Sequence, residues 1–241
     1  MRTIPPHIAQ CLRCDTPRRP LGPAALDAHL QGGIATDALH DMLAATPDDL
    51  AAAIAFTAGT AARLAGACPI LWVRQDAAEQ LSGALHAPGL AALGLDPARI
   101  LLVRARDAAS VLRAGLDAAR SGALGAVLIE PWGESRHLDM TATRRLALAA
   151  STTPVLLLRA GAPMPSAAAT RWRIRAAPSR PRLARAPGAA LHVELLRHRQ
   201  GIPGRAWLLE WDDEQREFRT AQDAGDAFSA SLGRAPVARA G

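Results

Sequence analysis

The sequence predicts an α/β fold with a mostly parallel sheet flanked by helices and, late in the chain, an antiparallel pair of strands. Short apolar runs alternate with helical stretches between residues 38 and 159, which is the order of repeated βαβ units. The run Val155–Arg159 is almost entirely apolar, as expected of a strand buried on both faces of a parallel sheet. After residue 166 the pattern changes to strict alternation, which is typical of strands with one solvated face. The 241 residues fit one such domain with small additions.

The first elements follow a lead that is rich in proline and arginine and is expected to be flexible over residues 1–30. Gly32–Gly33 predicts a turn, and Ala38–Ala44 predicts the first short strand. Thr46 then fits the N-cap of a helix that extends to about Gly66. A proline at the first helical position and two aspartates in the first turn support this start, because the helix dipole favours negative charge there.

The alternation continues through the middle of the chain. Its strands are joined by helical crossovers, which is the arrangement of a parallel sheet. The predicted ranges are strand Pro69–Arg74, a helical stretch to about Gly94, strand Ile100–Arg104, helix Asp107–Gly122, strand Ala126–Glu130, a helix capped by Asp139 that ends at Ala150, and strand Val155–Arg159.

The late part of the chain predicts strands of a different kind. In the segment Arg171–Arg175, Trp172 and Ile174 fall on one face and three arginines fall on the other. Leu191–Arg199 and Ala206–Trp211 are separated by a turn with glycines and predict an antiparallel pair added to the sheet.

Two segments in this part predict little structure of their own. Residues 178–188 contain three prolines and three arginines and fit a mobile linker. Residues 220–241 are rich in alanine, glycine and arginine and fit a flexible C-terminal tail. The predicted organisation is therefore a flexible lead, one domain over residues 31–219, and this tail.

Composition excludes several classes of protein. The chain has no lysine, so all 28 basic side chains are arginine and mechanisms that depend on a lysine are excluded. Three cysteines, an odd number, argue against a disulfide framework. The N-terminus has no apolar signal core, so export is not expected. We therefore expect the protein to lie in the reducing cytoplasm. The longest apolar stretch, Ala51–Val73, is interrupted by Arg63 and Pro69 and fits a helix followed by a strand, so no membrane span is expected.

The connection between the first strand and the first long helix does not match a phosphate-binding loop. Such a loop uses glycine-rich backbone N–H groups, a lysine, and a serine or threonine at the metal. Residues 44–50 have no glycine and no lysine; Pro47 lacks an N–H, and Asp48 and Asp49 would repel a triphosphate. We therefore expect no bound nucleotide cofactor, and a solvated helix cap at this position.

Other candidate chemistry is weak. Glu130 ends a strand where a nucleotidase often places an acid, but without a phosphate cradle we expect a strand-end acid that faces solvent. His7, Cys11 and Cys14 form an incomplete zinc ligand set, so we expect free thiols and no metal. Cys68 fits a small core residue. The remaining histidines fit no catalytic motif, and no catalytic residue is assigned.

The region rich in arginine is more informative. Twelve arginines lie between Arg144 and Arg205, and Glu194 is the only acid among them. Such a region attracts phosphate backbones with little sequence preference. A solvated face, or ion pairs with acids between Glu210 and Asp226 or on another chain, explains the same pattern equally well. The candidate contact residues are Arg171, Arg173, Arg175, Arg197, Arg199 and Arg205.

Taken together, several segments resemble the ImuA family, RecA-like proteins of bacterial SOS mutagenesis operons. The resemblance covers roughly residues 24–218. The segments that carry it are Gly32–Ile34, Ala38–Ala44, Leu93–Arg104, Leu138–Leu146, Ser166–Ile174 and His192–Arg197.

The resemblance implies a degenerate RecA-like core over residues 31–219, without a phosphate-binding loop, in an accessory protein that is not an enzyme. It implies three protein partners in translesion synthesis: an ImuB-like inactive Y-family polymerase, an error-prone replicative-type DNA polymerase, and RecA. Single-stranded DNA would be a further partner, and the location would be the cytoplasm in association with the nucleoid. A divergent ATPase and a cell-division inhibitor of the SulA type are the alternatives.

The resemblance also assigns roles to particular positions. The two DNA-binding loops of RecA correspond to residues 131–138 and 160–170, which are short, and leave Arg136 and Arg159 as candidates for a reduced DNA contact. The basic pair with which RecA reaches the nucleotide of a neighbouring subunit corresponds to Arg197 and Arg199. Without a nucleotide, we expect these two arginines to contact a partner protein.

Overall fold

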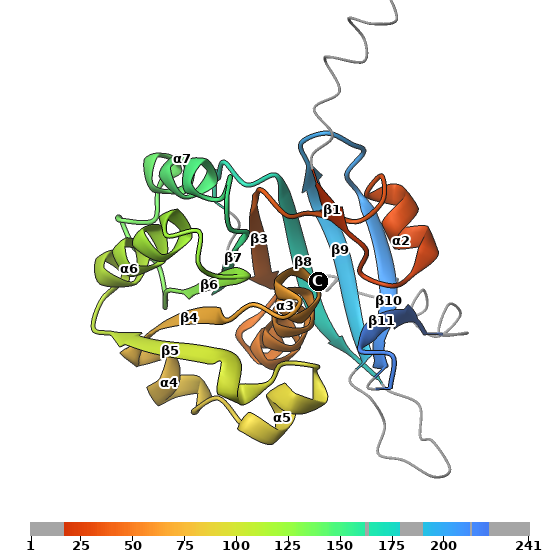
Figure 1. The fold of residues 1–241 in the computed structure, drawn as a ribbon, viewed down its shortest axis with the longest axis horizontal. Helices are drawn as coiled ribbons and strands as arrows, with labels where there is room; N and C mark the ends of the chain where they lie inside the picture. The colour runs from red at the N-terminus through yellow and green to blue at the C-terminus, as the bar shows by residue number, and fades with distance from the viewer. Residues whose placement is uncertain (1–16, 162–163, 179–189, 213, 222–241) are drawn as a thin grey trace, which may run out of the picture.

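The computed structural model describes residues 17–161, 164–178, 190–212 and 214–221. In this part of the chain nine strands form one sheet in the order β11-β10-β9-β8-β3-β7-β6-β4-β5, with β5 at one edge and β11 at the other (Figure 1). From β8 to β5 in this order, each strand runs parallel to its neighbours. At the other end of the sheet, the pairs β8–β9, β9–β10 and β10–β11 are antiparallel. The strands are β3 (Leu39–Ala44), β4 (Ile70–Gln75), β5 (Ile100–Ala105), β6 (Ala126–Glu130), β7 (Val155–Ala160), β8 (Thr170–Ala177), β9 (Ala190–His198), β10 (Arg205–Asp212) and β11 (Glu217–Thr220). The predicted fold class, including the late antiparallel strands, is confirmed.

Helices cover the parallel part of the sheet on both faces, and α3 lies opposite α6 and α7 (Figure 1). In β7, Leu156 and Leu158 belong to the apolar cluster beneath α3, whereas Val155 and Leu157 belong to the cluster beneath α6 and α7. This two-sided burial explains the apolar runs of the sequence. The helices are α3 (Leu50–Ala65), α4 (Asp76–Ser82), α5 (Ala87–Ala92), α6 (Ala108–Arg120) and α7 (Met140–Ala149).

Local signals place the helix ends where the sequence predicts them. Asp107 accepts a hydrogen bond from the backbone N–H of Ser110 at 2.8 Å, and Asp139 accepts one from Ala142 at 2.7 Å, so each aspartate caps its helix. The bond from Ser110 also lowers the pKa of Asp107.

The helical stretch predicted up to Gly94 is instead two short helices, α4 and α5, in succession. In the described residues, no helix has the length and apolar composition needed to cross a bilayer.

The lead predicted as flexible over residues 1–30 is wrong for residues 17–30, which belong to the folded domain. They form β1 (Arg18–Arg19) and α2 (Ala24–His29), and β1 pairs antiparallel with β2 (Ile34–Ala35). Three leucines, Leu21, Leu26 and Leu30, are fully buried here, so apolar burial outweighs the proline and arginine content. Residues 1–16 lie outside the described residues.

The predicted turn at Gly32–Gly33 is present and needs glycine. Gly33 has a φ of +123°, and a Cβ there would collide with the backbone carbonyl of Arg19. This glycine therefore lets the second strand of the small β1–β2 ribbon approach the first.

The C-terminal strands pack onto α3 through aromatic rings. Phe218 of β11 is fully buried, and its ring centroid lies 5.1 Å from that of Phe56 and 4.9 Å from that of Trp211. Gly59 of α3 makes room for them, since a Cβ there would lie 2.6 Å from Phe218 and 2.8 Å from Trp211. The sequence did not predict β11, which adds one strand beyond the expected pair. The linker residues 179–188 and tail residues 222–241 lie outside the described residues.

Candidate functional site

The connection between β3 and α3 occupies the position at which a phosphate-binding loop would lie, and it holds an anion of its own. One carboxylate oxygen of Asp49 accepts hydrogen bonds from the backbone N–H of Thr46 at 3.1 Å and from its hydroxyl at 2.7 Å. The other oxygen accepts the backbone N–H of Ala176, in β8, at 2.8 Å. The backbone N–H and hydroxyl of Thr46, just before the helix, and the backbone N–H of Ala176 are therefore directed at a carboxylate that belongs to the chain. This carboxylate places negative charge at the end of the helix that would otherwise attract a phosphate.

Glu130, at the end of β6, is buried and not exposed as expected from the sequence. Its side chain accepts hydrogen bonds from Arg74 at 2.7 and 3.1 Å and from the indole N–H of Trp72 at 2.9 Å. Glu130 and Arg74 are each 1% exposed. The prediction was wrong because β4 and β6 are neighbours and place Arg74 directly opposite Glu130, which the local sequence does not show. Both carboxylate oxygens are thus engaged within the protein.

A second buried carboxylate, Asp41 in β3, binds two of the candidate arginines. Arg159 donates to its two oxygens at 3.2 Å each, and Arg171 donates to one of them at 2.9 Å. Asp41 is fully buried, and the side chains of Arg159 and Arg171 are 7% and 14% exposed. Sequence reasoning missed Asp41, although an acid inside a predicted buried strand was the available signal.

The other arginines of β8 share one face of the strand with Arg171, as the alternation predicts. Arg173 pairs with Glu194 across the β8–β9 ladder at 3.2 Å, and both side chains are about one third exposed. Arg175 lies opposite His192. The pKa of His192 is lowered mainly by burial and, to a smaller extent, by the guanidinium of Arg175. This face of the sheet is therefore cationic, with several of its charges already balanced.

The remaining candidate arginines do not join this face into one patch. Arg197 donates to the carbonyl of Ser166 at 2.6 Å. Arg199 and Arg205 are exposed, and the Arg205 guanidinium lies 5.7 Å from the ring centroid of Trp207. The strand register places these three arginines near the start of β8, whereas exposed Arg136 follows β6 at the edge where the parallel strands end.

His40 is a buried histidine with both ring nitrogens engaged. One nitrogen is 2.7 Å from the Thr170 hydroxyl and the other is 2.8 Å from the carbonyl of Ala35. The Thr170 oxygen in turn accepts the indole N–H of Trp172. Burial lowers the pKa of His40 to about 4, so the ring is neutral at physiological pH. His40 is therefore a core histidine with both ring nitrogens hydrogen-bonded inside the protein.

The structure describes Cys68 but not the other two cysteines. Cys68 is exposed, so its prediction as a core residue is wrong, because the turn between α3 and β4 lies at the surface. Among the described residues no three His, Cys, Asp or Glu side chains gather as metal ligands. His7, Cys11 and Cys14 lie outside those residues.

The edge strand β5 exposes a patch that the sequence did not predict. Leu101, Leu102 and Val103 are 54%, 46% and 36% exposed. Because β5 is the last strand of the sheet on this side, its outer backbone groups have no neighbouring strand in the described chain. An apolar, unpaired strand edge is a common site for association with another chain.

The chain matches no protein-family model. It is 34% identical over 221 residues to Protein ImuA of Caulobacter vibrioides strain NA1000 / CB15N, covering 82% of this chain and 85% of that protein, and the same values hold for strain ATCC 19089 / CIP 103742 / CB 15. The crystal structure of the RadB recombinase superposes with a TM-score of 0.56 at 15% identity, covering 84% of this chain and 99% of that one.

Proposed function

Since this chain belongs to the ImuA family, we propose that it is a non-catalytic, RecA-like accessory protein of SOS-induced translesion DNA synthesis, acting through contacts with other proteins. Family membership and a fold shared with the RadB recombinase support the RecA-like part of this proposal. The absence of lysine supports the non-catalytic part, because the phosphate-binding lysine of such folds has no counterpart here.

The observation that carries the proposal is the carboxylate of Asp49 at the start of α3. It accepts hydrogen bonds from Thr46 and Ala176. Pro47, which follows Thr46, has no backbone N–H that a phosphate could use. A triphosphate at this position would need to displace a hydrogen-bonded carboxylate and approach the negative charge of Asp48 as well. This arrangement supports a nucleotide-independent role.

We propose the partners that the family resemblance implies: an ImuB-like inactive polymerase, an error-prone replicative-type polymerase, and RecA. Two surfaces are available for them, the apolar edge of β5 and the exposed arginines around β8, β9 and β10. Single-stranded DNA is a proposed further ligand, with association at the nucleoid. For DNA we favour Arg136, Arg175, Arg199 and Arg205 over Arg159 and Arg171, because the last two already bind Asp41.

Isothermal titration with magnesium and ATP tests the nucleotide-independent role. We expect no saturable heat with ATP at about 1 mM, a concentration at which even a weak site with a binding free energy of roughly −4 kcal/mol would be about half occupied. RecA titrated under the same conditions is the positive control. Micromolar binding would contradict the argument from Asp49 and would favour the divergent ATPase.

Charge reversal tests the partner surface. The double variant Arg197→Glu with Arg199→Glu is expected to weaken binding to purified RecA or to the ImuB-like polymerase at least about tenfold, because each glutamate would repel the acidic side chains of a partner that an arginine attracts. Surface plasmon resonance gives the dissociation constants. The control is Arg120→Glu with Arg144→Glu, an equal charge change on exposed arginines of α6 and α7. Equal affinity of both double variants for RecA or the polymerase would exclude Arg197 and Arg199 from the partner interface. Binding of the protein to the cell-division protein FtsZ, and not to these partners, would favour the SulA-like alternative.

A further inference from the structure

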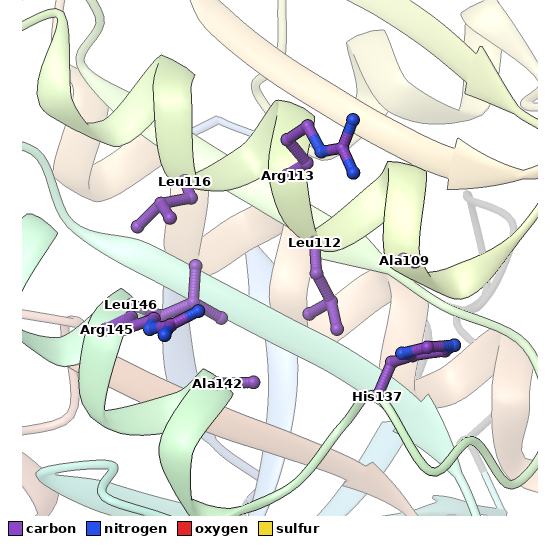
Figure 2. A pocket seen from close by; sticks show the side chains of 8 residues that line it. All are labelled: Ala109, Leu112, Arg113, Leu116, His137, Ala142, Arg145 and Leu146. Carbon is purple, nitrogen blue, oxygen red and sulfur yellow. The ribbon is translucent and has the colours of Figure 1, made fainter.

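A groove of about 360 Å³ lies between α6 and α7, on the face of the sheet opposite α3 (Figure 2). Its apolar lining consists of Leu112 and Leu116 from α6 and Leu146 from α7, with Ala109 and Ala142 alongside. The small alanine side chains leave space between the helices that larger residues would fill. Figure 2 shows the leucines lying between the two helices.

The polar side chains of the groove are all cationic or neutral. Arg113 of α6, Arg145 of α7 and His137 of the preceding loop are exposed and complete the lining, which contains no carboxylate. Neither arginine forms an ion pair with a carboxylate of the described residues. This contrasts with Arg159, Arg171 and Arg173, which are matched by acids of the chain. The groove therefore presents two arginines that form no ion pair with an acid of the described residues.

We propose that this groove binds a segment of a partner protein in which an apolar side chain is flanked by carboxylates. The leucines and alanines supply the surface on which an apolar side chain gains by leaving water. Arg113 and Arg145, one on each helix, supply forked donors that match carboxylates on either side of it.

The lining favours a protein segment over nucleic acid. Phosphate groups would use the arginines but would make no use of the apolar lining, in which Leu116 is the leucine that is partly exposed. Recognition of single-stranded bases commonly relies on aromatic side chains for stacking, and the lining has no Phe, Tyr or Trp. An acidic and apolar segment uses both parts of the groove.

Fluorescence anisotropy with a labelled peptide tests the inference on the full chain. The probe is a synthetic peptide with a central Leu-Phe pair and two glutamates on each side. Saturable binding is expected, and it should be weakened at least about tenfold by Arg113→Glu with Arg145→Glu. Leu116→Gln, which changes no charge, should weaken it as well. NMR amide shifts on peptide addition should map to α6 and α7.

Matched controls separate this site from general charge attraction. Arg120→Glu with Arg144→Glu makes the same charge change on the same helices outside the groove lining, and it should leave peptide affinity within about twofold. A peptide with serines in place of Leu-Phe keeps its charge and should bind at least about tenfold more weakly. Equal loss in both double variants, equal affinity for both peptides, or no binding at about 1 mM peptide would each overturn the proposal. So would loss of single-stranded DNA binding in the groove variants with peptide binding unchanged.

Discussion

Replacing Glu130 with leucine is expected to lower the free energy of unfolding by about 3–5 kcal/mol. The carboxylate is 1% exposed and accepts hydrogen bonds from Arg74 and from the indole of Trp72. Its removal leaves a buried guanidinium without a counter-charge and a buried N–H without an acceptor, and both are costly in the interior. Urea denaturation followed by circular dichroism measures the change as a shift of the unfolding midpoint.

A second variant makes this result specific to the ion pair. Glu130→Leu combined with Arg74→Met removes both charges and fills their space with apolar atoms, so most of the lost stability should return. If the single variant were as stable as the parent, Glu130 would not have the structural role we assign to it. A stable Glu130→Leu variant that had lost a nucleotidase activity would assign the residue to catalysis instead.

Neutralising Asp41 with asparagine is expected to lower the free energy of unfolding by a similar amount, about 3–5 kcal/mol. Two guanidiniums, those of Arg159 and Arg171, share this carboxylate at 2.9 to 3.2 Å. An asparagine has no charge, and its amide N–H₂ group cannot accept a hydrogen bond from the second arginine. The buried positive charges would then repel each other without compensation. Thermal and urea unfolding of the variant and the parent give the difference.

The control for Asp41 is Asp48→Asn, which makes the same charge change on an exposed aspartate of the 3₁₀ turn Pro47–Asp49. Its stability should stay within about 0.5 kcal/mol of the parent, as is usual for surface positions. A comparable loss in both variants would show that net charge, and not the buried cluster, is responsible.

The elements of the parallel sheet could be predicted from the sequence because the residues that indicate each helix or strand lie within a few positions of one another. Asp107 and Asp139 cap their helices as expected, and Val155–Arg159 becomes a buried strand. Residues 17–30 were wrongly predicted to be flexible because they are rich in proline and arginine. The information about burial lay in three leucines that are separated in the sequence. The exposure of β5 was missed because its apolar residues look like those of a central strand, and only the strand order reveals an edge.

The candidate site was predicted less well because its contacts join distant parts of the chain. The alternation correctly put Arg171, Arg173 and Arg175 on one face of a strand. Nothing near Arg171 in sequence indicated Asp41, which is 130 residues away. The same holds for Arg74 and Glu130, which are 56 residues apart. Arginine counts therefore located a cationic region, but the charges left free for a ligand depended on strand pairing.

The carboxylate of Asp49 at the start of α3 also bears on how the protein is controlled. A recombinase with a nucleotide at this position changes conformation as the nucleotide is hydrolysed and exchanged. In this chain the carboxylate at this position belongs to the protein itself, accepts hydrogen bonds from Thr46 and Ala176, and is neither hydrolysed nor released. We therefore expect its shape to be insensitive to the ratio of ATP to ADP. The level of its activity would then be set by the amount of protein made and degraded and by the partners present.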